Sequence, residues 1–295
     1  MKKKMLASLL LSAIVLSVGA QAASAENLES SKTTGDVTFI HGGKPDVTKP
    51  VEGPKEDGQI LEEDLDEDKN PIPLPNNGGI YVTHLPNFSF GENNQTSVKT
   101  KEYQAYTEMR KLKSVEAGNP DTFYMPHSVQ VSDVSGNENA TWSLSVVQDT
   151  PFESKDNSKL TNTRIRIFGN TFTNTLHDSE KLAEGITGVG LENEDVTSSN
   201  YSAIPVANAE TNEGTLTVLK NTKKGFTNAS TTSAVFSNGY LEENYGPEKT
   251  NVAEAYDGVK LNVPASDQAK AKKYTTQLTW TLAVEPGIAE SAPTE

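Results

Sequence analysis

The chain has 295 residues, no cysteine and a formal net charge of -14 at pH 7. The lack of cysteine excludes disulfides and thiolate metal sites, so a stable fold must rest on a packed core, and the length allows one large β domain or two ordinary ones. The negative charge disfavours nucleic acid and anionic membrane surfaces as partners.

The N-terminus has the three parts of a secretory signal peptide. Lys2, Lys3 and Lys4 precede an apolar run, Met5–Val18, which ends near the small residues Ala23-Ser24-Ala25. This order predicts a signal peptide over residues 1–25. Its removal would take away three positive charges and no negative one, changing the formal charge from -14 to -17.

The sequence offers no visible way of holding the exported protein on the cell covalently. The apolar run is shorter than the roughly 20 residues of a membrane-spanning helix, and no later stretch approaches that length. There is no lipoprotein cysteine and no apolar C-terminal anchor segment. We therefore expect no membrane insertion and a disordered C-terminal tail over 287–295.

Residues 44–77 differ in composition from the rest of the chain. They contain six prolines, an acidic cluster at Glu62–Asp68 and few apolar side chains, which predicts a flexible, extended segment. The alternating carboxylates Asp64, Asp66 and Asp68 could converge on a calcium ion. However, Lys69 and Pro75 stand where a calcium loop needs glycine and a bidentate glutamate. A solvated acidic tether is favoured, and no metal site is expected.

Period-two alternation, which is typical of half-buried strands, marks much of the remaining chain. Between Tyr274 and Val284 the even positions are mostly apolar and the odd ones mostly polar. The stretches Trp142–Val146 and Arg164–Ile167 alternate in the same way. Shorter predicted strands are Asp36–His41, Ile80–Thr83, Ser128–Val131, Gly214–Leu219 and Val259–Val263.

Many short strands between turn residues predict an all-β fold, a single large antiparallel β-sandwich-like domain with long polar loops over residues 26–286. Ser128–Ser132 and Trp142–Gln148, joined by the polar stretch 133–141, are expected to form a hairpin. Lys101–Glu116 could hold a short helix.

The sequence shows no recognisable set of catalytic residues. His41, His84, His127 and His177 lack the spacing of zinc ligands and are expected at the surface or at sheet edges. Gly185–Gly190 lacks the lysine of a phosphate loop, and no nucleophile elbow is present. The 40 acidic residues leave a glycosidase carboxylate pair open as an alternative, but nothing points to one. We expect neither an enzyme nor a cofactor.

Both tryptophans of the chain sit in Trp-x-Leu units, Trp142-Ser-Leu144 and Trp280-Thr-Leu282. With Tyr274, Leu278 and Pro286, the distal unit matches a Tyr-x-x-x-aliphatic-Thr-Trp-x-Leu-x-x-x-Pro pattern, so the sequence resembles the WxL-domain surface proteins of Gram-positive bacteria. Other segments similar to that family are Thr34–Phe39, Leu85–Gly91 and Gly258–Pro264. The stretch Asp133-Val-Ser-Gly136 departs from it, because we expect Asp-x-Arg-Gly before the proximal tryptophan.

The resemblance implies a secreted protein that is retained at the cell wall by non-covalent attachment to peptidoglycan. It also implies possible association with other WxL proteins and with a membrane-anchored surface partner. An alternative is an interaction subunit or adhesin that binds partner or host matrix proteins and has little direct contact with glycan.

The candidate residues for cell-wall or partner binding are Trp142, Leu144, Tyr274, Leu278, Trp280 and Leu282. Their side chains could form an apolar platform that stacks on sugar rings or fills pockets of a partner. The same alternation also fits a strand face that packs into the core, and the sequence leaves both interpretations open. If the two strands are neighbours, the Trp-x-Leu units would form one apolar ridge. Nearby, Lys270, Lys272 and Lys273 either contact a peptide-stem carboxylate or serve solubility.

Overall fold

The computed structural model describes residues 37–51, 53, 59–65, 68–189, 201–207 and 214–285. The chain divides into a unit of residues 1–38 and a compact unit of residues 39–295, and the second is the subject below. The predicted signal peptide at 1–25 and the predicted tail at 287–295 lie outside the described residues, as do Asp36, Asp66 and Pro286.

The described strands form three larger sheets and two small ribbons, and all the strand pairs within them are antiparallel. The first sheet consists of β1 (Asn76–Asn77), β2 (Ile80–His84), β6 (Ser128–Asp133), β15 (Ser230–Val235) and β11 (Thr171–Asn174), in that order. The second has the order β13 (Ser202–Ala203), β10 (Arg164–Ile167), β16 (Ala255–Val263) and β3 (Lys101–Tyr106). The third has the order β12 (Ile186–Gly188), β14 (Leu216–Asn221), β7 (Thr141–Gln148) and β17 (Leu278–Glu285).

The ribbons are β4 (Glu108–Lys111) with β5 (Thr122–Met125), and β8 (Phe152–Glu153) with β9 (Lys159–Leu160). The helices among the described residues are short: α1 (Ser179–Leu182) and the 3₁₀ turns Glu242–Asn244 and Ala265–Asp267. The all-β, antiparallel fold predicted from the alternation is therefore confirmed.

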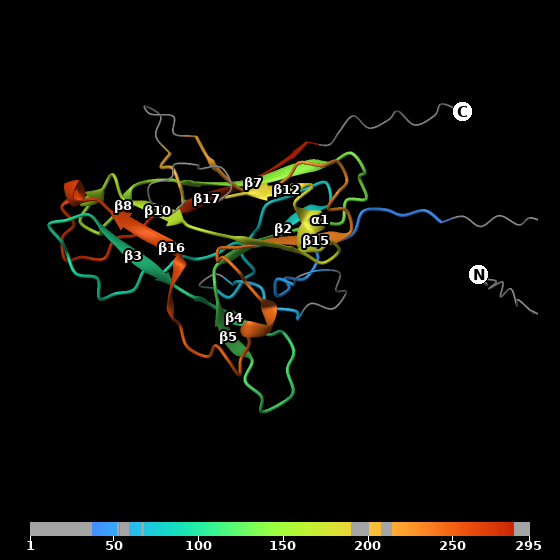
Figure 1. Cartoon of the computed structure of the whole chain (residues 1–295), viewed down its shortest axis with the longest axis horizontal. Coiled ribbons are helices and arrows are strands. Elements are labelled where there is room, and N and C mark those ends of the chain that lie inside the picture. Colours follow the sequence, from blue (N-terminus) through green and yellow to red (C-terminus); the bar gives the residue numbers. More distant parts are fainter. Residues whose placement is uncertain are drawn as a thin grey trace, which may run out of the picture. The chain divides into compact units, whose positions relative to one another are not determined.

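One apolar core is shared by the three larger sheets. The inward residues of the first sheet, such as Val131, meet Leu144 of the third sheet and Ile165 of the second in the same buried cluster. In Figure 1, β7 and β17 lie above β2 and β15, while the β4–β5 ribbon stands apart below them. A second, smaller core lies under that ribbon around Phe123.

The proline-rich, acidic segment covers the face of the first sheet that points away from the main core. Gln130 on β6 points away from the main core, donates through Nε2 to Thr48 O at 2.9 Å and accepts from Thr48 N at 3.1 Å. Val47 and Leu61 are buried in the second core. The solvated-tether interpretation therefore misses these residues, because composition does not reveal that a packed sheet face needs them as a cover.

Two sequence predictions about connections are wrong. β6 pairs with β2 and β15, whereas β7 pairs with β14 and β17, so residues 133–141 cross between sheets and no β6–β7 hairpin exists. Each of these strands already has two neighbours. The short helix considered for Lys101–Glu116 is replaced by β3 and β4, because β3 pairs along β16 and tertiary pairing overrides local propensity.

The predicted strand boundaries vary in accuracy. The strands expected around Ile80, Ser128, Trp142 and Ile165 are present, and β16 is longer than expected. The distal strand begins at Leu278, four residues after Tyr274. The described part of the first predicted strand, residues 37–41, is not a strand, and Phe39 is 86 % exposed there, because it has no partner.

Candidate functional site

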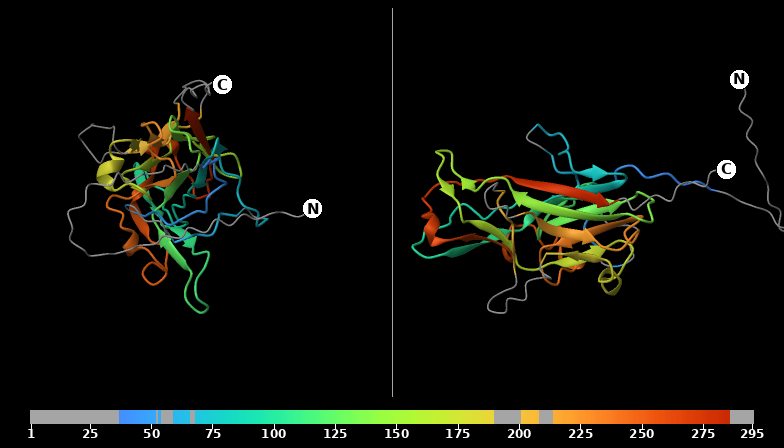
Figure 2. Two further views of the ribbon diagram at one scale, coloured as in Figure 1. Left: turned by 90° about the vertical axis from the view of Figure 1, so that its right-hand side faces the viewer. Right: turned by 90° about the horizontal axis from the view of Figure 1, so that it is seen from above.

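The distal Trp-x-Leu strand, β17, is the outermost strand of its sheet in the described part of the chain. It pairs along its whole length with β7 and with no other named strand. Figure 2 (right) shows it in red beside β7 in green. Because side chains of a strand alternate between its faces, Leu278, Trp280, Leu282 and Val284 share one face.

The register brings the two Trp-x-Leu units into contact. Leu282 lies directly opposite Leu144, Trp280 opposite Val146, and Val284 opposite Trp142. Residues directly opposite in an antiparallel pair lie on the same face, so the apolar row of β7 continues onto β17. The two strands are therefore neighbours, as the ridge hypothesis requires.

The proximal tryptophan is a core residue in this structure. Trp142 is 2 % exposed, and its indole Nε1 donates a hydrogen bond to Thr227 Oγ1 at 2.9 Å. Thr227 Oγ1 in turn donates to Asp133 Oδ2 at 2.9 Å. Leu144 is fully buried beside it. A buried indole needs a partner for its N–H, and this chain of hydrogen bonds supplies it.

A serine stands at the position where the family pattern led us to expect an arginine, and it takes part in the same chain of hydrogen bonds. Ser135 occupies that position, and both its backbone N–H and its hydroxyl donate to Asp133 Oδ1, at 3.1 and 2.7 Å. Asp133 is completely buried. Ser135 and Thr227 therefore satisfy both oxygens of this buried carboxylate without an arginine.

The distal residues are only half-buried. Leu278, Trp280, Leu282 and Val284 are partly buried against the main core and keep part of their surface exposed, and so does Tyr274 just before the strand. We call these five residues the distal strip. Within its sheet β17 has a hydrogen-bonded partner on one side only, whereas β7 lies between β14 and β17, so the row on β7 is buried and the strip remains partly accessible.

The distal strip itself carries no charge, and the lysines beside it are partly engaged. Lys272 forms an ion pair with Asp156. The hydrogen bond from Lys272, followed by one from Ser154, lowers the pKa of Asp156 to about 2. The backbone N–H of Lys270 donates to the hydroxyl of Tyr274 at 3.1 Å. The strip can therefore bind by apolar contact and aromatic stacking.

A buried charged cluster that sequence reasoning missed lies beside the β4–β5 ribbon. His84 has one ring nitrogen 2.9 Å from Asp64 Oδ2 and the other 3.3 Å from Glu108 Oε2, and Arg110 Nη1 donates to Asp64 Oδ1 at 3.0 Å. Both His84 and Arg110 are buried, at 4 % and 3 % exposure. Neither spacing nor alternation in the sequence marks these residues as partners.

Burial by itself would raise the pKa values of the two carboxyl groups, but their basic neighbours outweigh it. The pKa of Asp64 is lowered to about 2 by His84 and Arg110. The pKa of Glu108 is also lowered, chiefly by His84. Asp64 thus joins the acidic segment to the body of the domain.

His127 is buried too, so the expectation of surface or edge histidines is wrong for His84 and His127. The Nδ1 atom of His127 is 2.6 Å from the hydroxyl of Tyr256, and its Nε2 atom is 3.0 Å from Asn87 O. Burial lowers the pKa of His127, against the opposing charge of Glu108. These histidines hold the structure together, because their ring nitrogens satisfy buried partners.

Comparison with known proteins identifies the chain. Residues 25–286 match the model of the WxL domain family, described as surface cell wall-binding. No curated protein and no solved structure matches. None of the described helices is long and apolar enough to cross a membrane, and no three described His, Asp or Glu side chains are grouped to hold a metal ion. The match covers most of the chain, so this protein belongs to the WxL domain family of surface, cell wall-binding domains.

Proposed function

We propose that this protein is exported by its signal peptide and attaches non-covalently to the peptidoglycan of a Gram-positive cell wall through the distal strip. The single observation that carries this proposal is the partly exposed, uncharged distal strip, which consists of four apolar side chains on β17, Trp280 among them, and of Tyr274 just before the strand. Aromatic side chains that keep one face open to solvent bind the apolar faces of sugar rings well.

The family description supports cell-wall binding in general, and the choice of peptidoglycan is part of the proposal. The strongly negative chain would be repelled by anionic phosphate polymers, whereas the glycan strands of peptidoglycan carry no such charge density. Trp142 and Leu144 act in this proposal through β7, which holds β17 in place.

The direct test is co-sedimentation of the purified mature protein with peptidoglycan that has been freed of proteins and anionic polymers. We expect wild-type protein in the pellet and Trp280→Ala largely in the supernatant. Thr281→Ala is the matched control, because Thr281 lies on the opposite face of the same strand. If the wild-type protein stays in the supernatant, or if Trp280→Ala pellets as well as Thr281→Ala, the proposal is wrong.

A second candidate is an interaction subunit that recruits another surface protein or a host matrix protein. The observation that favours it is the position of β17 at the end of its sheet, with eight residues and no proline or lysine. Such an edge can accept an extended strand from a partner by backbone hydrogen bonding. Cells that have been stripped of surface proteins but keep an intact wall distinguish the two candidates. If the purified protein is retained on such cells, glycan binding is supported. If it is no longer retained, binding to a protein partner is supported.

We take the protein to be non-enzymatic. Asp64 and Glu108 are the two carboxylates that His84 brings together, and both are held by basic neighbours with lowered pKa values. A glycosidase needs one carboxyl group with a raised pKa as its general acid. Release of reducing ends from wall polysaccharide by the purified protein would overturn this part of the proposal.

A further inference from the structure

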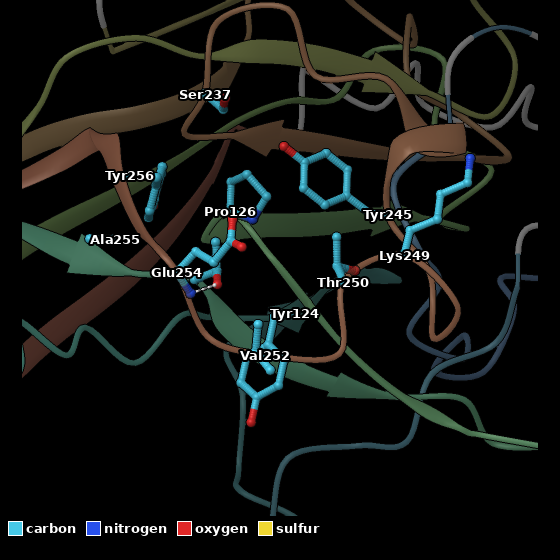
Figure 3. A pocket seen from close by; sticks show the side chains of 11 residues that line it. Tyr124, Pro126, Ser237, Tyr245, Lys249, Thr250, Val252, Glu254, Ala255 and Tyr256 are labelled. Atoms are coloured by element: carbon cyan, nitrogen blue, oxygen red, sulfur yellow. Dashed lines mark hydrogen bonds between the residues drawn. The ribbon is translucent and has the colours of Figure 1, made fainter.

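A cavity unrelated to the distal strip lies between the β4–β5 ribbon and the segment that leads into β16. Its volume is about 150 Å³, and it shares no residue with the strip. Pro126 lines the cavity and in Figure 3 lies between Tyr245 on one side and Tyr256 on the other. Tyr124, Thr107 and Thr250 are also part of its wall.

The aromatic rings of this cavity are held in place by the rest of the fold. Tyr245 stacks on Tyr240 with ring centroids 5.2 Å apart, and the Tyr240 hydroxyl donates to Pro50 O at 3.1 Å. Tyr240 therefore covers one face of the Tyr245 ring, and Tyr245 also lines the cavity. The hydroxyl of Tyr256 is fixed by His127 Nδ1 at 2.6 Å. Rings fixed in this way lose little entropy when a ligand arrives.

Hydroxyl groups surround the rings. Thr107 Oγ1 accepts the backbone N–H of Glu254 at 3.0 Å, which leaves its own proton for a ligand. Thr250 is tied to Gly246 through its hydroxyl, and its carbonyl accepts from Tyr124 N at 2.7 Å, so this loop is braced against β5. In Figure 3 the hydroxyl of Tyr245 extends toward Ser237.

The size and charge of the cavity restrict its ligand. A volume of about 150 Å³ is that of protein cavities that hold a single six-membered ring. One lysine, Lys249, and one glutamate, Glu254, line the cavity and offset each other. A ligand with a six-membered ring, apolar C–H faces, several hydroxyls and no charge satisfies all of these features, and this describes a pyranose.

We propose that this cavity is a second binding site of the protein and takes one uncharged pyranose ring, stacked on Tyr245 and hydrogen-bonded by the surrounding hydroxyls. The site is separate from attachment through the distal strip and does not depend on it. For a ligand of this size the expected affinity is on the order of 1 mM.

The test is a titration followed by NMR, with wild-type protein carrying labelled tyrosine. The probes are methyl β-glucopyranoside and methyl N-acetyl-β-glucosaminide, with glucuronate as the anionic control. We expect one or both neutral sugars to shift the ring resonances of Tyr245 and Tyr124, and glucuronate to leave them unchanged. Binding of the acetylated sugar alone would indicate a wall-type glycan, and binding of both a broader range of glycans. If neither sugar shifts these resonances, the proposal is overturned.

Variants give an independent measurement by saturation transfer to the sugar. Tyr245→Leu should lose most of the signal, Tyr245→Phe should keep at least half of it because the ring remains, and Tyr81→Leu in β2 serves as the matched control. Equal binding by Tyr245→Leu and wild type would contradict the proposal. Because Tyr245 lies outside the distal strip, Tyr245→Leu should still pellet with peptidoglycan, so failure of this site and failure of wall attachment are distinguishable.

Discussion

The two Trp-x-Leu strands carry the same motif in opposite environments. On β7 the motif lies in the middle of its sheet and is buried, with the Trp142 indole hydrogen-bonded to Thr227. On β17 it lies at the edge, and Trp280 is half-open to solvent. The spacing of Trp and Leu therefore determines which face of a strand is apolar, whereas the place of the strand in its sheet determines whether that face is fully buried or stays partly exposed.

The largest effect is expected from truncation of the buried tryptophan. Trp142→Ala should lower the free energy of unfolding by about 3–5 kcal/mol, because it removes a large core side chain and one of the two donors to Thr227 Oγ1, the other being Asn221 Nδ2. Urea denaturation measures the change. Trp142→Phe keeps most of the volume and should cost clearly less. A loss below about 1 kcal/mol for Trp142→Ala would show that Trp142 is not a core residue in solution.

Low pH should reduce the stability of the domain without changing binding through the distal strip. The folded-state pKa values of Asp64, Glu108 and His127 all lie below their ordinary values, so the unfolded chain takes up more protons and stability falls as pH falls. The loss should begin below about pH 6.5 through His127 and grow below about pH 4.5 through the carboxyl groups. Asp64 alone should account for about 2 kcal/mol, lost between about pH 4 and pH 2.

Thermal unfolding between pH 7 and pH 3 measures this change. In the variant His84→Asn, the loss of stability at acid pH should be smaller than in the wild type. Wall binding should stay constant while the domain is folded, because the distal strip carries no titratable carboxylate or histidine. Stability that is independent of pH over this range would contradict the role of the cluster.

Truncation of the half-buried Trp280 should affect binding more than stability, the converse of truncation at Trp142. Trp280→Ala should weaken peptidoglycan binding about tenfold, which corresponds to about 1.4 kcal/mol, and should destabilise the fold by only about 1 kcal/mol. Binding isotherms on purified wall and urea denaturation of the same samples measure both quantities. A large loss of stability with unchanged binding would reverse the assignment of the two strands.

The smallest effect is expected on the outer face of β17. Thr281→Ala should change stability by no more than about 0.5 kcal/mol and leave wall binding unchanged, since Thr281 is exposed and faces away from the strip. The same two measurements apply. A clear loss of binding in this variant would move the contact surface to the opposite side of the sheet.

The faces of the strands could be predicted from the sequence because alternation is a local property. Trp142, Leu144 and Val146 share a face whatever surrounds them, and so do Trp280 and Leu282. The neighbours of a strand depend on the whole chain. Nothing within β6 or β7 reveals that they belong to different sheets, and nothing within β17 marks it as an edge.

The buried charged cluster was beyond sequence reasoning for a similar reason. Asp64 belongs to a run of acidic residues, most of which would be solvated in any protein, and Arg110 stands next to Met109, which is 58 % exposed. The inward turn of Arg110 follows from the pairing of β4 with β5, and its partner comes from 46 positions earlier in the chain. The tyrosines of the cavity likewise come from separate segments.

The hydrogen bonds between Thr48 and Gln130 bear on the order in which this chain folds. The two residues are 82 positions apart, and β15, whose Ser233 also bonds Gln130, comes about a hundred residues later still. A chain emerges N-terminus first, so the segment around Thr48 appears long before the sheet that it covers exists. Contacts between such distant positions slow folding. The native hydrogen bonds of this early segment can therefore form only after β6 has been made, and the sheet face that it covers is complete only after β15.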